Sequence, residues 1–232
     1  MSHNKSSSAM VGNHPMLDGV KDDLNNCAIA AAKLPDSLEF EKLFIFAAIR
    51  RTLSLIVAFR QSIEVGNEQM AVTILRLNLD TVARFYALFW ADETDGMGAE
   101  SFAKQVFDGV QINRMKLRNQ KREATDAWLI DQIETLAPWI KEVYRINSGA
   151  IHFSGFHMKR VLQQVESHCA QDEGGLRVSL ILGGTEKIEG PDQYKIVKQA
   201  FHHICQLLVC AMQDRCGLLE RSLAGDLHEH DG

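Results

Sequence analysis

Residues 138–157 (PWIKEVYRINSGAIHFSGFH) carry a group of catalytic side-chain types at helical spacing. Arg145, Ser148 and His152 lie at positions i, i+3 and i+7 of this stretch. A helix turns about 100° per residue, so these positions share one face of a continuous helix. Histidine acts as a general base near neutral pH, and arginine stabilises a developing phosphorane charge. The spacing therefore suits metal-free cleavage of RNA, in which His152 removes the 2′-OH proton and Arg145 stabilises the intermediate.

The same residues also fit a purely structural role. Arg145 can pair with an acidic residue on a facing helix, and His152, which has apolar neighbours, can be a buried core histidine. The spacing also recurs between Arg221 and His228, so it arises easily by chance. From the residues alone, the catalytic and the structural interpretations both stay open.

A second set of charged residues, Arg76, Asp80 and Arg84, falls at positions i, i+4 and i+8 of an otherwise apolar stretch. Charges in such a helix must be paired or must face a cleft. Asp80 lies one turn from each arginine, so local ion pairs would make a structural seam. Alternatively, Asp80 or Arg84 reaches the stretch 138–157, where it positions His152 or contacts a phosphate.

The remaining motifs predict neither a metal site nor a cofactor site. His152 and His157 are five residues apart, off-register for a common helical face, and no nearby carboxylate completes a set of metal ligands. Gly183-Gly184 lacks the Lys and the Ser or Thr that follow in a phosphate-binding loop. We therefore expect no metal and no cofactor.

The elements that position these residues are predicted to be mainly helices. Apolar residues recur at helical spacing between Pro, Gly and capping residues, which is typical of a helical bundle. The predicted helices cover residues 16–33, 38–64, 68–91, 99–106, 128–136, 138–157 and 194–223. Residues 109–123 are basic and weakly patterned, which fits a partly exposed loop or a marginal helix. Val161–Val165 and Leu176–Leu182 are predicted as the strands of a small β-hairpin, inserted at about residues 159–183.

Composition points to one globular domain. The 232 residues are 46% apolar with a net charge of −5, so nucleic-acid binding by the whole surface is not expected. We predict a single domain over residues 15–223 between a disordered tail (1–14) and a flexible tail (224–232). The five cysteines form no Cys-x-x-Cys pair, and no signal peptide or membrane-length apolar run is apparent. A cytoplasmic protein with no membrane partner is expected.

Two segments carry a resemblance to a known family: RLNLDTVARFYALFWADE (residues 76–93) and YRINSGAIHFSGFH (residues 144–157). Together they resemble a group of bacterial helical proteins that are similar to the HEPN superfamily, over roughly residues 38–219. HEPN proteins are α-helical bundles and commonly dimers, and many are metal-independent endoribonucleases with an Arg-x₄₋₆-His motif. Many of them act as toxins or as phage-defence effectors.

By this resemblance, Arg145 and His152 match the catalytic Arg and His of the motif. The supporting residues implied are Ser148, Asn147, Asp80, Arg84, Arg76 and His157. The resemblance implies a HEPN-like homodimer that cleaves RNA as a toxin or phage-defence effector, with an antitoxin or defence-system protein as a further partner. The alternative is a non-catalytic helical module for binding or dimerisation, in which the same residues form a buried polar network.

Overall fold

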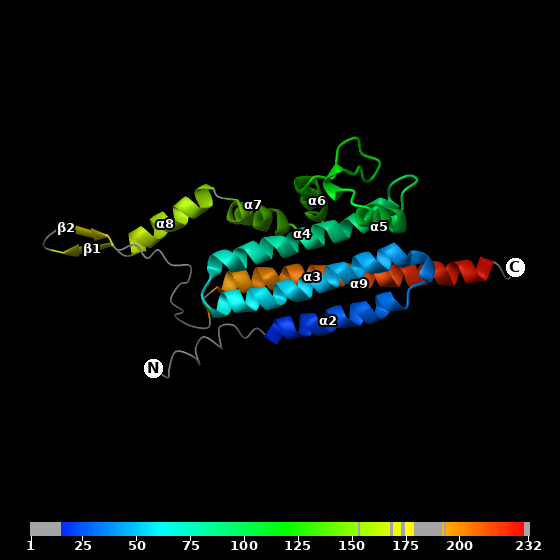
Figure 1. The fold of residues 1–232 in the computed structure, drawn as a ribbon, viewed down its shortest axis with the longest axis horizontal. Coiled ribbons are helices and arrows are strands. Elements are labelled where there is room, and N and C mark those ends of the chain that lie inside the picture. The colour runs from blue at the N-terminus through cyan, green and yellow to red at the C-terminus, as the bar shows by residue number, and fades with distance from the viewer. Residues whose placement is uncertain are drawn as a thin grey trace.

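The computed structural model describes residues 15–152, 154–167, 169–172, 175–178, 192 and 194–229. The body of the molecule consists of long helices that run side by side (Figure 1). They are α2 (Pro15–Ala32), α3 (Glu39–Glu64), α4 (Glu68–Asp92) and α9 (Lys195–Glu229). The predicted helical bundle is therefore confirmed. The predicted tail at residues 1–14 lies outside the described residues, and α9 continues past its predicted end at residue 223.

Shorter helices lie along the side of α4 that faces away from α2 (Figure 1). They are α5 (Ala99–Phe107), the 3-10 turn η2 (Ile112–Arg114), α6 (Asp126–Ile133) and α7 (Ile140–Ile151). Beyond α7, α8 (Gly155–Ser167) and the strands β1 (Cys169–Asp172) and β2 (Gly175–Val178) project past the end of the bundle. None of the helices in the described part of the chain is long and apolar enough to cross a membrane.

Local signals account for the long helices. Asn67 begins α4, because its side chain accepts the backbone N–H of Met70 at 3.0 Å. Gly66 adopts a positive φ of 72° in the link between α3 and α4, which few residues other than glycine tolerate. So short a link makes the two helices antiparallel neighbours, as the sequence predicts. The stacked rings of Phe59 on α3 and Phe201 on α9, 4.0 Å apart, then join this pair to the last helix.

Residues 109–123 form an irregular segment with the single turn η2. Of the two predictions for this segment, a partly exposed loop or a marginal helix, the loop is therefore the one found. The segment is anchored by buried apolar side chains, Ile112, Met115 and Leu117. Its basic residues, by contrast, are exposed: Arg114, Lys116, Arg118, Lys121 and Arg122.

The predicted β-hairpin is not seen in the form expected. Residues 161–165, predicted as its first strand, lie within α8. The apolar positions here fit a helical repeat better than an alternating one: Met158, Val161, Leu162 and Val165. A short antiparallel pairing of β1 with β2 occurs after α8 instead. Residues 179–182 of the predicted second strand lie outside the described residues.

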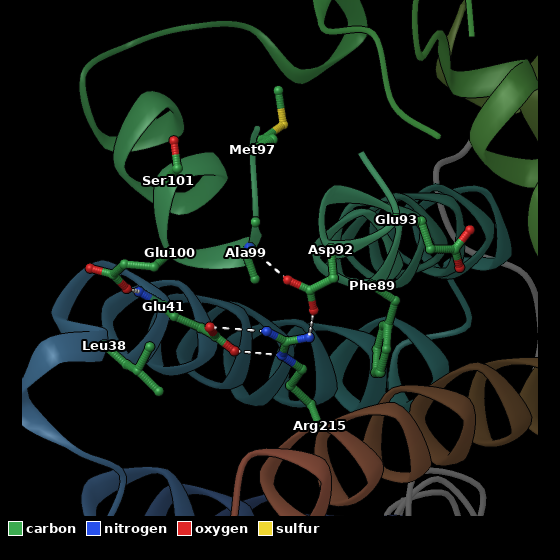
Figure 2. Close-up of a pocket in the computed structure, with 11 residues that line it drawn as sticks. Leu38, Glu41, Phe89, Asp92, Glu93, Met97, Ala99, Glu100, Ser101 and Arg215 are labelled. Carbon is green, nitrogen blue, oxygen red and sulfur yellow. Dashed lines mark hydrogen bonds and ion pairs between the residues drawn. The ribbon is translucent and has the colours of Figure 1, made fainter. Parts of the chain in front are cut away.

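A partly buried ion cluster joins α3, α4 and α9 (Figure 2). Arg215 on α9 donates from Nε and Nη2 to the two carboxylate oxygens of Glu41, at 2.5 and 3.1 Å. Its Nη1 donates to Asp92 at the end of α4. Glu41 is 1% exposed and Arg215 is 5% exposed. Burial lowers the pKa of Arg215, but the two carboxylates more than offset this and the pKa is raised overall, so the guanidinium stays charged.

The cluster also sets the start of α5. Asp92 Oδ1 accepts the backbone N–H of Ala99 at 2.8 Å. One residue later, the Glu100 carboxylate accepts the backbone N–H groups of Phe40 and Glu41, at 3.1 and 2.8 Å. These are free donors of the first turn of α3, which a carboxylate satisfies well.

Arg215→Ala is expected to lower the free energy of unfolding by about 3–5 kcal/mol, because it leaves the Glu41 carboxylate buried without its partner. The measurement is urea denaturation followed by circular dichroism. Arg50→Ala removes an exposed arginine of α3 and should change the same quantity by less than about 0.5 kcal/mol. The double change Arg215→Met with Glu41→Leu should recover most of the loss. A double variant as unstable as Arg215→Ala would show that charge burial is not the cause.

Candidate functional site

The three charged residues of α4 pair with one another. Asp80 contacts Arg84 and lies 3.9 Å from Arg76 Nη1, and each arginine is one turn away on the same helix. Arg84 Nη2 also reaches Asp126, the first residue of α6, at 3.0 Å. We call Arg76, Asp80 and Arg84 the α4 seam. Of the two alternatives left open by the sequence, the local ion pairs are present, and Arg84 reaches α6 instead of His152.

Arg76 joins the seam to α7. Its guanidinium carbon lies 4.3 Å from the ring centroid of Tyr144, and the residue is only 6% exposed. A cation over an aromatic face is attracted by the ring, the more so when water is excluded. Gln69 adds a second link, because its Nε2 donates to the carbonyl of Ala150 at 3.0 Å. The two segments that carry the family resemblance therefore pack against each other.

Asn147 and Ser148 use their side chains within α7. Asn147 is 9% exposed, and its Nδ2 donates to the carbonyl of Val143 at 2.7 Å. The Ser148 hydroxyl donates to the carbonyl of Tyr144 at 2.6 Å. Both contacts are of the local type that polar side chains make inside helices. The Ser148 oxygen keeps its acceptor capacity, but its proton is already engaged.

Arg145 is on the solvent face of α7. Its side chain is 70% exposed, and it donates from Nε and Nη2 to Glu142 at 2.9 and 2.6 Å. This hydrogen bonding raises the pKa of Arg145 and lowers that of Glu142. An exposed pair three residues apart adds little to stability and can exchange partners readily.

His152 is also exposed, but it lies outside the helix. The expected continuous helix over residues 138–157 is wrong, because α7 ends at Ile151 and His152 has an extended backbone (φ −111°, ψ 141°). Arg145 and His152 therefore do not share one helical face. Among the described residues, no hydrogen bond or ion pair joins their side chains.

Ser154 is the physical cause of the break. Its hydroxyl donates to the carbonyl of Gly149 at 3.0 Å, which satisfies an acceptor in the last turn of α7. The same oxygen accepts the backbone N–H of Phe156 at 3.3 Å and so caps the start of α8. One serine thus ends one helix and begins the next, and the chain turns at His152.

His157 and Gly149 complete the turn between α7 and α8. A ring nitrogen of His157, Nε2, lies 3.1 Å from the carbonyl oxygen of His152. Gly149 has no side chain where Phe156 approaches: an added Cβ would lie 2.9 Å from Phe156 Cβ and 3.2 Å from Ser154 Oγ. His157 therefore contacts the backbone of the turn, and Gly149 permits the close approach.

The sequence missed three residues that the site uses: Arg51, Asp126 and Tyr144. Arg51 on α3 donates from Nε to Thr81 Oγ1 at 2.9 Å, one residue beyond Asp80. The sequence did contain a signal for Arg51, because a charged residue in a helix as apolar as α3 must be paired or face a cleft. The same reasoning identified the α4 seam. Asp126 and Tyr144 gave no such signal, because an acid in the first turn of a helix and a tyrosine within a helix are both common.

A cavity of about 550 Å³ surrounds the Arg215 cluster (Figure 2). Its carboxylates already have partners: Glu41 and Asp92 bind Arg215, and Glu100 binds backbone N–H groups of α3. The fourth acid of its lining, Glu93, pairs with Arg118 at 2.6 Å. These contacts give this cavity a structural role.

A buried thiol near the centre of the bundle is not a nucleophile. The Cys205 sulfur accepts from Asn78 Nδ2 at 3.2 Å, and Asn78 in turn accepts from the Thr52 hydroxyl at 3.1 Å. Burial raises the pKa of Cys205 to about 12, although the hydrogen bond from Asn78 opposes this. The thiol is therefore protonated at neutral pH.

Comparisons of the chain with protein-family models, with curated proteins and with solved structures found no match.

Gly149→Ala is expected to disturb the turn that presents His152, because the new methyl group would overlap Phe156. The expected result is a shift of the His152 and Phe156 resonances in two-dimensional NMR spectra and a loss of about 1–3 kcal/mol in unfolding free energy. Gly155→Ala is the matched control, since an added Cβ there meets nothing within 4 Å. Equal effects of the two changes would contradict the close-approach argument.

Arg76 and Tyr144 are expected to be energetically coupled. In a double-mutant cycle with Arg76→Met and Tyr144→Leu, urea denaturation should give a coupling free energy of about 1–2 kcal/mol, the range for a desolvated cation over a ring. The pair Arg60→Met with Tyr144→Leu is the control. Arg60 binds Asp18 on α2, so its coupling to Tyr144 should be near zero. A near-zero value for Arg76 as well would remove this link between α4 and α7.

Proposed function

We propose that this chain is a metal-independent endoribonuclease of the HEPN kind, with Arg145 and His152 as its catalytic residues. The observation that carries the proposal is that both side chains are exposed, Arg145 on α7 to 70% and His152 on the turn after it. A histidine held for core packing would be buried, and His152 is not. An exposed His152 is accessible to a phosphodiester, and so is Arg145 when it leaves Glu142.

In the proposed reaction, His152 takes the proton of a ribose 2′-OH, and the 2′-oxygen attacks the adjacent phosphorus. Arg145 leaves Glu142 and binds the phosphorane oxygens, whose added negative charge its planar guanidinium stabilises. The P–O5′ bond then breaks. Solvent protonates the leaving 5′-oxygen, and His152 returns its proton to solvent. The products are a 2′,3′-cyclic phosphate and a 5′-hydroxyl.

We further propose a homodimer that gathers the catalytic side chains. Apolar residues are exposed on α7 and α8 on both sides of the His152 turn: Ile146, Ile151, Met158, Val161 and Leu162. Exposed apolar groups of this kind mark surfaces that associate with a partner. A second copy bound here would bring two Arg145–His152 motifs to one interface, and a positive cleft could form on an otherwise acidic protein.

The alternative function is a non-catalytic module for binding or dimerisation. It is favoured by the supporting residues, because the α4 seam pairs within the fold and Asn147 and Ser148 bond within α7. These contacts are of the structural kind that this alternative predicts, although Arg145 and His152 take no part in them. Under it, the exposed surface of α7 and α8 binds a partner, and no RNA is cleaved.

The test is incubation of the purified protein with total RNA in EDTA. Wild type is expected to leave 2′,3′-cyclic phosphate ends, and Arg145→Ala and His152→Ala each to reduce cleavage at least about 100-fold, the usual contribution of a general base or a charge-stabilising group. Both residues are exposed, so the variants should keep wild-type stability. Arg50→Ala and His203→Ala remove an exposed arginine and histidine elsewhere and should cleave normally.

The role in the cell is tested with the same variants. If the chain is a toxin or a phage-defence effector, expression of wild type should arrest bacterial growth, and either catalytic change should relieve the arrest. Absence of cleavage by folded, dimeric protein, together with harmless expression, would favour the binding module.

A further inference from the structure

A second cavity, of about 360 Å³, opens between α3, α4, α5 and η2. Its lining residues in the described part of the chain come from these elements, and none comes from α7 or α8. It is therefore separate from the Arg145–His152 motif. Its volume lies in the lower part of the range of small-molecule sites, about 300–1,000 Å³.

Part of the lining of this cleft is apolar and rigid. The Phe44 ring lies 5.9 Å from that of Phe102 and 6.4 Å from that of Phe85, and both of those residues are 0% exposed. The core therefore fixes the position of Phe44. The other apolar lining residues are Ala47, Ala48, Val106 and Ile112.

Two guanidinium groups line the same cleft, those of Arg51 and Arg84. Thr81 orients Arg51: its hydroxyl donates to the carbonyl of Leu77 at 3.1 Å and accepts from Arg51 Nε at 2.9 Å. No residue in the described part of the chain accepts from the terminal nitrogens of Arg51. An arginine carries N–H donors on all three nitrogens, so those on the terminal pair remain for a ligand.

The charges around the cleft do not balance. Arg51, Asp80 and Arg84 line it. Arg76 pairs with Asp80, and Asp126 pairs with Arg84. These three arginines and two carboxylates leave one positive charge in excess. Burial lowers the pKa of Arg84, Asp126 opposes this, and Arg76 and Arg51 lower it further. An anion beside these groups would relieve their mutual repulsion.

We propose that this cleft binds a small amphipathic monocarboxylate, an aromatic or short aliphatic acid. Its carboxylate binds the terminal N–H groups of Arg51, because a planar guanidinium matches a carboxylate, and it lies beside the charge of Arg84. Its apolar body lies against Phe44 and the alanines of α3. One excess positive charge suits a monoanion, and the apolar lining disfavours a fully hydrated ion such as phosphate.

The test is isothermal titration calorimetry of the full chain with phenylacetate and with octanoate at fixed ionic strength. At least one acid should bind saturably, and its neutral amide should not. Arg51→Gln should weaken binding at least about tenfold, the size expected when a charge-assisted hydrogen bond is lost. Arg50→Gln removes the same charge one residue away and should leave the affinity unchanged.

A second variant tests the cavity independently of charge. Ala47 is exposed and lines the cleft, so Ala47→Trp should fill it and abolish binding, with an unchanged circular dichroism spectrum. The proposal is overturned if neither acid binds saturably, if Arg50→Gln weakens binding as much as Arg51→Gln, or if Ala47→Trp binds as wild type does. Inorganic phosphate that binds as tightly as the acids would also overturn it, in favour of a general anion site.

Discussion

The charge of Arg215 is the constraint around which the bundle is arranged. Burying a guanidinium is costly unless carboxylates neutralise it, and here they come from Glu41 at the start of α3 and Asp92 at the end of α4. The register of α9 against both helices is therefore fixed at one point. Asp92 of the same cluster accepts the backbone N–H of Ala99 and so sets where α5 begins. Glu100, one residue later, caps the start of α3. The cleft beside Arg51 lies between helices held in this way.

The seam on α4 serves two sides of that helix. Arg76 turns toward α7 and stacks on Tyr144, whereas Arg84 reaches Asp126 on α6 and lines the cleft with Arg51. Asp80 lies between the two arginines, and its carboxylate neutralises charge that a largely apolar helix would otherwise bury unpaired. The α4 seam thus attaches α6 and α7 to the bundle, and the positive charge of Arg84 stays accessible in the cleft.

Stability and the proposed catalysis are located in different parts of the molecule. The buried core extends from the long helices α2, α3, α4 and α9 into α5, α6 and Ile140 at the start of α7. Arg145 and His152, by contrast, are exposed on α7 and on the turn after it. Substitutions at Arg145 and His152 therefore leave the core contacts intact. The exposed apolar residues of α7 and α8 flank the same turn, so an association there would act on the motif directly.

The sequence by itself determined most of the helices, although not α8, and the pairing within the α4 seam, because these depend on residues no more than about one turn apart. It predicted most helix limits to within a few residues and identified Arg76, Asp80 and Arg84 as a group. It did not predict that Ser154 would break the helix before His152, since the helical spacing continues through the break. Tertiary structure decided the partners of Arg51, Tyr144 and Arg215. The Arg215–Glu41 contact joins residues 174 positions apart. Such contacts depend on how helices pack, and the spacing of residues along one helix carries no information about them.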